Sequence, residues 1–181
     1  MDLISLEVFL ELLITNNYVQ VKNMEKLRLD LNGLLEYQQN RYPYLLIDVA
    51  EEVIPGKSAK GYKNLTINDW WFEVHFPGDP SMPGALQIEA MVQLGALMVT
   101  TLPGNKGKVV YLTSANNLKL IKKILPGDRL DIVTKLLSWK RGIGKCTGAG
   151  FVSGKKVCSI DFNIIMPHIL EEYTVKNNSP N

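Results

Sequence analysis

GALQIEAMVQLGALMVTTL (residues 84–102) is the stretch of sequence that most strongly determines the fold. Apolar residues occupy nearly every side of this segment rather than a single stripe, so a helix formed by it must be surrounded by the rest of the protein. Pro103 and Gly104 follow it and are typical helix-ending residues. The sequence therefore predicts a long central helix.

Short strand-like segments, separated by turn residues, lie on both sides of this predicted helix. Before it, residues 44–54 and 58–67 are predicted to form a hairpin around Pro55 and Gly56. After it, four more strands are predicted, at residues 108–114, 129–138, 144–152 and 156–166. Strands joined by short turns without intervening helices form antiparallel sheets. We therefore expect an α+β domain in which an antiparallel sheet wraps the central helix.

The chain has 181 residues and fits one domain, which we place at residues 24–168. Residues 1–23 form an N-terminal extension whose apolar run, interrupted by Glu7 and Glu11, predicts a short amphipathic helix. The run is too short to span a bilayer and lacks the charged start of a secretory signal. We therefore expect a cytoplasmic protein without a membrane partner, and a polar tail at residues 169–181.

The net charge of +2 hides an uneven distribution along the chain. Residues 1–100 carry 7 Lys/Arg and 13 Asp/Glu, whereas residues 101–181 carry 13 Lys/Arg and 5 Asp/Glu. A solvated basic face is the ordinary interpretation, and a landing site for an acidic partner is the functional one. The candidate contacts are Lys119, Lys122, Lys123, Lys140 and Arg141. Nucleic acid is disfavoured because no aromatic residues interleave with these charges.

Neither the cysteines nor the histidines suggest a metal or cofactor. Cys146 and Cys158 lack the spacing of a metal site or a disulfide framework, so ordinary reduced thiols are expected. His168 is far in sequence from any acidic cluster that could complete a ligand set. We predict no metal and no cofactor.

His75 and Glu89 are the best candidates for chemistry in this chain. Imidazole exchanges protons near neutral pH, and a carboxyl group desolvated by apolar neighbours can remain protonated and act as an acid. Taken singly, each has a simpler structural explanation: a partly exposed strand-end histidine, and a glutamate bonded to a neighbour such as Gln93, one turn later. Together they suggest acid–base catalysis.

The segment between these two residues strengthens the catalytic interpretation. Residues 76–84 hold three prolines and three glycine or aspartate turn residues, which predicts an irregular loop that ends where the helix begins. Gly84 lies at that helix N-terminus, where a free backbone N–H and the helix dipole suit a carbonyl oxygen that gains negative charge. A base, an acid and an oxyanion donor are the groups needed for an elimination in which a proton is removed beside a carbonyl and a β-substituent is lost.

Six sequence blocks resemble those of FabZ-type 3-hydroxyacyl-[acyl-carrier-protein] dehydratases of the FabA/FabZ hot-dog family. The blocks, which follow in the family's order, are RYPYLLID (41–48), NLTIN (64–68), HFPGDPSMPG (75–84), IEAMVQ (88–93), LPGD (125–128) and RGIGK (141–145). The resemblance covers residues 29 to 166. It implies the hot-dog fold, which agrees with the sheet and helix expected above.

The resemblance also implies roles for individual residues. It makes His75 and Glu89 catalytic, with each of the two supplied by a different subunit of a homodimer or of a trimer of dimers. Gly84 would bind the thioester carbonyl, and Tyr111 would lie near the mouth of an acyl tunnel. Gln93 and Phe76 are further candidate substrate contacts. The partner would be an acyl carrier protein bearing a 3-hydroxyacyl thioester, docked on the candidate carrier-protein contacts Lys119, Lys122, Lys123 and Arg141.

Some positions depart from the family pattern and leave alternatives open. Val74 replaces a glycine before the catalytic histidine, which is expected to narrow the site or restrict the backbone, and Asn40 replaces a histidine. GDPSMPGALQIEAM (residues 78–91) also resembles the FabA branch, which both dehydrates and isomerises, although that branch has Asp in place of Glu89. The alternatives to dehydration are a FabA-like dehydratase/isomerase, a hot-dog thioesterase and a non-catalytic binder of acyl carriers.

Overall fold

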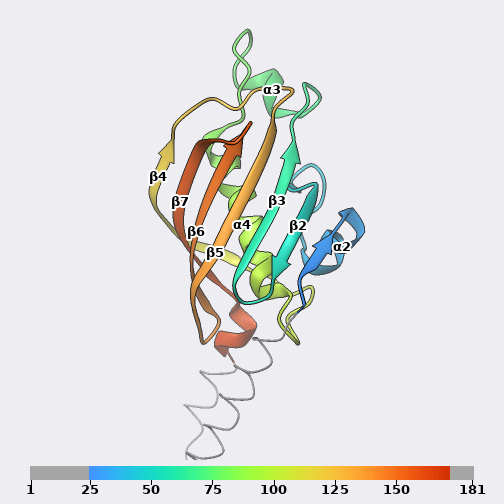
Figure 1. Ribbon diagram of the computed structural model, residues 1–181, viewed down its shortest axis with the longest axis vertical. Helices are drawn as coiled ribbons and strands as arrows, with labels where there is room; N and C mark the ends of the chain where they lie inside the picture. The colour runs from blue at the N-terminus through green and yellow to red at the C-terminus, as the bar shows by residue number, and fades with distance from the viewer. Residues whose placement is uncertain (1–24, 172–181) are drawn as a thin grey trace, which may run out of the picture.

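The computed structural model describes residues 25–171 as one antiparallel sheet curved around a long helix (Figure 1). The labelled helices are α2 (Leu31–Tyr37), α3 (Trp71–Val74) and α4 (Gly84–Thr100). The strands are β1 (Leu27–Leu29), β2 (Val49–Ile54), β3 (Ser58–Asn64), β4 (Tyr111–Leu120), β5 (Arg129–Lys140), β6 (Ile143–Val152) and β7 (Lys155–Ile165). The expected hot-dog architecture is confirmed.

The strand order is β1-β2-β3-β5-β6-β7-β4, with every neighbouring pair antiparallel. The hairpins β2–β3, β5–β6 and β6–β7 join consecutive strands, so each pair needs only a tight turn. Strand β4 follows α4 in the chain but pairs with the last strand, β7. It therefore forms one edge of the sheet among the described residues.

Helix α4 packs against β2, β3, β5, β6 and β7 and is buried on most sides, as its sequence predicts. Gly95 in the middle of this helix costs stability relative to alanine, by about 1 kcal/mol in an ordinary exposed helix. Here a Cβ atom would lie 2.8 Å from Cζ of Phe162 on β7. Glycine therefore allows the helix to approach the sheet closely.

The predicted hairpin before the helix is present, but its first strand is shorter than expected. Residues 44–48 are not in a strand, and β2 begins at Val49. The backbone N–H of Leu46 donates to the side chain of Gln93 instead of to a neighbouring strand, and Leu46 and Ile47 are buried against the core. Likewise, β3 ends at Asn64, because the N–H of Leu65 donates to the carbonyl oxygen of Asp128.

The strands after the helix match the predictions except for the first. Strands β5, β6 and β7 lie within two residues of the expected bounds, whereas β4 covers Tyr111–Leu120 rather than residues 108–114. Its pairing with β7 contains two bulges, which carry the ladder past the expected end. The short elements β1 and α3 were not predicted, and a helical turn at residues 167–171 replaces part of the expected polar tail.

Cys146 and Cys158 are buried in the core as free thiols, and burial raises their pKa to about 12 and about 11, respectively. Such thiols stay protonated and unreactive near neutral pH. Within residues 25–171, no helix is long and apolar enough to cross a membrane. The predicted amphipathic helix of residues 1–23 and the tail beyond residue 171 lie outside the described residues.

Candidate active site

Glu89 lies on α4 and is held by Gln93, one turn further along the helix. Gln93 Nε2 donates to Glu89 Oε1 over 2.9 Å and to the carbonyl oxygen of Tyr44 over 2.8 Å. The N–H of Leu46 donates to Gln93 Oε1 over 2.9 Å, which fixes the orientation of the amide. The hydrogen bond predicted between Gln93 and Glu89 is therefore confirmed.

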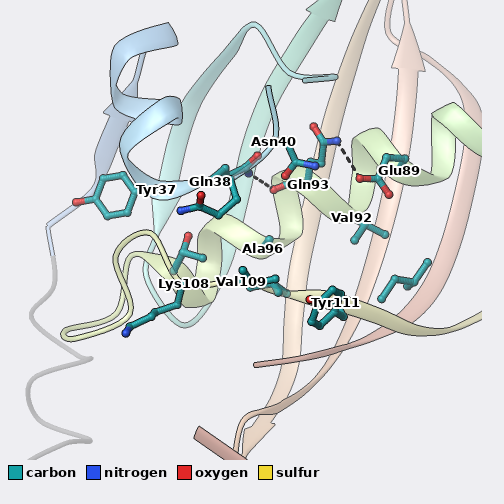
Figure 2. Close-up of a pocket in the computed structure, with 14 residues that line it drawn as sticks. Tyr37, Gln38, Asn40, Glu89, Val92, Gln93, Ala96, Lys108, Val109 and Tyr111 are labelled. Atoms are coloured by element: carbon teal, nitrogen blue, oxygen red, sulfur yellow. Dashed lines mark hydrogen bonds between the residues drawn. The ribbon is translucent and has the colours of Figure 1, made fainter. Parts of the chain in front are cut away.

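This arrangement defines what each oxygen of Glu89 can do. Oε1 accepts the Gln93 hydrogen bond, so a proton on the carboxyl group is best placed on Oε2. The side chain is half-buried and lines a cavity of about 330 Å³, bordered by α4 on one side and by residues 108–112 on another (Figure 2). Burial raises the pKa of Tyr44, so its phenol stays neutral beside this site.

His75 caps the C-terminal end of α3, and its ring is oriented by the main chain. Nδ1 lies 3.0 Å from the carbonyl oxygen of Ser81, and because a carbonyl can only accept, Nδ1 must carry the hydrogen. Nε2 is then left with the lone pair that a general base needs. The N–H of Ser81 also donates to the His75 carbonyl oxygen over 3.0 Å, so the loop closes on itself around the histidine.

Gly84 is the first residue of α4, as predicted. Its N–H has no acceptor among the described residues. The first hydrogen bonds of the helix are those from the Leu86 and Gln87 N–H groups to the carbonyl oxygen of Pro83. A Cβ at Gly84 would lie 2.5 Å from Leu120 Cδ1, so glycine also permits contact with the end of β4. The position is suited to an incoming carbonyl oxygen.

The two aromatic candidates lie in different places. Phe76 stacks on the His75 ring with 4.2 Å between ring centroids, and its side chain is mostly exposed. Tyr111 is the first residue of β4 and lines the cavity of Glu89 (Figure 2). Phe76 can therefore support the histidine, and Tyr111 can contact a molecule in the cavity.

Val74 creates no visible obstruction in this chain. Its side chain is 59% exposed, and it does not line the cavity of Glu89. It is also absent from the non-glycine residues with positive φ, which are Asn117, Arg141 and Ser153. The backbone at Val74 therefore adopts a conformation that does not require glycine.

The predicted carrier-binding residues do not form one patch within the chain. Lys119, Lys122 and Lys123 lie exposed at the end of β4 and in the following loop. Lys123 pairs with Asp79 in the loop that follows His75, so its charge is partly neutralised. Arg141 lies in the β5–β6 turn, at the end of the sheet opposite to Lys119. Strand β4 begins at that end, because its first residue, Tyr111, and the first residue of β6, Ile143, both pair with Ile165.

The structure of a single chain does not bring His75 into the cavity of Glu89. The cavity is lined by residues of α4, of the segment 37–40 and of the segment 108–112, and His75 is absent from its lining. Acid and base therefore occupy separate places in one protomer.

Comparison with known proteins gives the family. The family model described as "FabA-like domain" matches residues 39–161, which include His75, Gly84 and Glu89. The chain belongs to the FabA-like family.

Two curated proteins named 3-hydroxyacyl-[acyl-carrier-protein] dehydratase FabZ align over nearly their whole lengths. The one from Clostridium novyi (strain NT) is 43% identical over 139 residues, covering 73% of this chain and 96% of the relative. The one from Bacillus subtilis (strain 168) is 36% identical, covering 76% and 98%.

A solved structure supports the fold of this FabA-like chain. The dehydratase heterocomplex ApeI:P from Xenorhabdus doucetiae aligns with a TM-score of 0.66 over 80% of this chain and 97% of that chain. The two are only 16% identical in sequence, so this likeness bears on the fold alone.

Gln93 is expected to be the most important polar side chain for the stability of this FabA-like domain. Replacing it with methionine keeps the volume but leaves the Leu46 N–H and the Tyr44 carbonyl without partners, so we expect the free energy of unfolding to fall by about 2–4 kcal/mol. Urea unfolding measures this change. Gln87→Met is the matched control, because Gln87 is equally buried on α4 but makes a single side-chain hydrogen bond, to Met82 O. Equal losses for the two variants would contradict the role given to Gln93.

Proposed function

We propose that this protein dehydrates 3-hydroxyacyl thioesters, carried by an acyl carrier protein, to trans-2-enoyl thioesters. The observation that carries the proposal is the orientation of the two proton-transfer groups. His75 is bonded through Nδ1 and leaves Nε2 free, while Glu89 is bonded through Oε1 and leaves Oε2 free. One free group can remove a proton and the other can supply one. The names of the curated relatives describe this reaction.

The reaction follows from these roles. His75 Nε2 takes a proton from the α-carbon while the Gly84 N–H stabilises the negative charge that develops on the thioester oxygen. The electron pair forms the double bond, the bond to the 3-hydroxyl oxygen breaks, and Glu89 Oε2 gives that oxygen a proton. Water and the trans-2-enoyl thioester leave. A proton passing from the imidazolium to the carboxylate through solvent then restores the enzyme.

We further propose that the working unit is a homodimer, in which His75 of the partner subunit faces Glu89. Two observations support this proposal: His75 is absent from the cavity of Glu89, and β4 is an edge strand with an open hydrogen-bonding side. That strand and its flanks expose many large apolar side chains, which an isolated edge strand would normally avoid. They are Val109, Tyr111, Leu112, Leu118, Leu120 and Ile121.

The acyl carrier protein is proposed to dock near the end of β4. Lys119 and Lys122 are exposed there and form no ion pair among the described residues, and Lys123 pairs with the loop that follows His75. An acidic partner at this place would lie beside the His75 loop. Arg141 lies at the other end of the sheet, so within one chain it could not share this contact.

The test is a dehydration assay with purified full-length protein and 3-hydroxybutyryl-acyl carrier protein. We expect the absorbance of the conjugated enoyl thioester to rise in proportion to the enzyme concentration. Release of free thiol is measured in the same samples. If thiol appears without the enoyl product, the protein is a thioesterase and the proposed function is wrong. Tight carrier binding without either product would favour a non-catalytic binder.

A further inference from the structure

Asn40, one of the positions that departs from the family pattern, lies in the wall of the Glu89 cavity (Figure 2). Its side chain is partly buried and makes no hydrogen bond within residues 25–171. The other amide side chains that line the cavity are each bonded within the chain; they are Gln38, Gln39 and Gln93. Asn40 therefore offers the cavity an amide whose oxygen and nitrogen are both free.

Contacts on both sides of Asn40 hold its main chain in place. Gln38 Nε2 donates to a main-chain carbonyl oxygen of α4, and Gln39 Nε2 donates to that of Gly107 over 2.7 Å. The Arg41 guanidinium donates to three main-chain carbonyl oxygens, including that of Asn40 over 2.9 Å. The segment that carries Asn40 is thus tied to the central helix and to the loop before β4.

The same segment leads into the hydrogen bonds that orient Glu89. The N–H of Tyr44 donates to the carbonyl oxygen of Arg41 over 2.7 Å, so the chain turns directly after Asn40. The carbonyl oxygen of Tyr44 accepts from Gln93 Nε2, which also donates to Glu89 Oε1. Figure 2 accordingly shows Asn40 beside Gln93. Gln93 has no amide hydrogen left, so the free amide on this side of the cavity is that of Asn40.

The proposed dehydration needs a hydrogen-bond acceptor for the substrate's 3-hydroxyl group. A hydroxyl group has one hydrogen and two lone pairs, and Glu89 Oε2 must give its proton to one of these lone pairs. The hydroxyl hydrogen must then point elsewhere. A hydroxyl that donated to Glu89 would turn its lone pairs away from the proton that it needs. An acceptor beside Glu89 would prevent this unproductive orientation.

We propose that Asn40 Oδ1 accepts the hydrogen of the 3-hydroxyl group and so turns an oxygen lone pair toward Glu89 Oε2. The inference rests on the proposed function, because it takes the 3-hydroxyl group to lie at Glu89. No bond within the chain fixes the Asn40 amide, so its oxygen is able to turn to the hydroxyl. When the C–O bond breaks, the oxygen keeps its own hydrogen, receives the Glu89 proton and leaves as water. Asn40 exchanges no proton with the substrate.

The experiment measures the binding of two ligands that differ only in the hydroxyl, 3-hydroxybutyryl- and butyryl-acyl carrier protein. Full-length Glu89→Gln protein is used, because it cannot supply the proton and so does not consume the ligand. The introduced amide still has an oxygen to accept from Gln93, and it puts an N–H where the protonated carboxyl group has its O–H. Adding Asn40→Ala should raise the Kd of the hydroxyl-bearing ligand about fivefold, the loss of one net hydrogen bond. The Kd of the butyryl ligand should stay within about twofold.

Two further variants separate the hydrogen bond from the shape of the wall. Asn40→Asp keeps an oxygen acceptor on a side chain of the same size, so it should retain the preference for the hydroxyl-bearing ligand. Gln39→Ala is the matched control, because Gln39 lines the same cavity but its amide is bonded to Gly107. It should affect both ligands alike.

The effect on turnover is measured with Asn40→Ala in an otherwise wild-type chain. We expect kcat/KM for dehydration to fall at least about fivefold, since the variant loses the hydrogen bond that orients the leaving group. The melting temperature should stay near that of wild type, because the Asn40 side chain bonds to nothing within residues 25–171.

Several outcomes would overturn this proposal without touching the proposed function. If Asn40→Ala weakens the binding of both ligands equally, Asn40 only shapes the wall. An unchanged preference in Asn40→Ala would mean that the hydroxyl hydrogen has another acceptor. If Asn40→Asp loses the preference as Asn40→Ala does, the amide oxygen is not the group that binds. Failure of wild type to dehydrate 3-hydroxybutyryl-acyl carrier protein would instead refute the proposed function and this inference with it.

Discussion

His75→Ala is expected to lower kcat for dehydration by roughly 10²- to 10⁴-fold, the usual contribution of a positioned general base. The variant removes Nε2, the nitrogen whose lone pair takes the α-proton. The loop that follows keeps its main-chain hydrogen bonds. Stability should change by only about 1 kcal/mol, because the side chain is partly exposed and makes a single hydrogen bond. The enoyl-thioester assay and a thermal melt measure the two effects.

The second histidine of the chain provides the control. His168 lies in the helical turn at residues 167–171 and does not line the cavity of Glu89. His168→Ala should therefore leave kcat within about twofold of wild type, which is less than 1 kcal/mol in activation free energy. If both histidine variants were equally active, His75 would not be the base, whatever the effect on stability.

The fold was predictable wherever a local pattern decides it. Residues 84–102 are apolar on all sides, and α4 was found within two residues of this segment. The strands predicted at residues 129–138, 144–152 and 156–166 correspond to β5, β6 and β7. Residues 44–48 read as a strand because they are apolar, but a hydrogen bond from Leu46 to Gln93, 47 residues away, replaces strand pairing. No local pattern records such a contact.

The candidate site was predictable for side chains but not for the main chain. His75, Glu89 and their spacing were evident in the sequence, and the Gln93–Glu89 bond follows from the i, i+4 geometry of a helix. The orientation of His75 depends on the carbonyl oxygen of Ser81, which every residue type could supply. The buried and unpaired Gln38 Oε1 and Thr100 Oγ1 were not predicted, because burial without a partner is visible only in the packing.

Mixing two inactive variants tests whether each active site needs both subunits. When His75→Ala and Glu89→Gln chains are co-expressed equally, random pairing makes half of the dimers mixed, and each mixed dimer has one intact site if His75 of the partner subunit serves Glu89. We expect activity to recover to about a quarter of the wild-type value, far above either variant alone. If both groups came from the same chain, no mixed dimer would contain an intact site and activity would stay near zero.

The reciprocal mixture makes the test independent of how well the variants assemble. Wild type co-expressed with the double variant His75→Ala, Glu89→Gln gives mixed dimers in which a shared site always lacks one group. Activity should then be about a quarter of the wild-type value, from wild-type pairs alone, whereas sites contained within one chain would give about half. Measured values near zero for the first mixture and near half for the second would place His75 and Glu89 in one protomer and refute the shared site. Size-exclusion chromatography of each mixture verifies that equal amounts of dimer are compared.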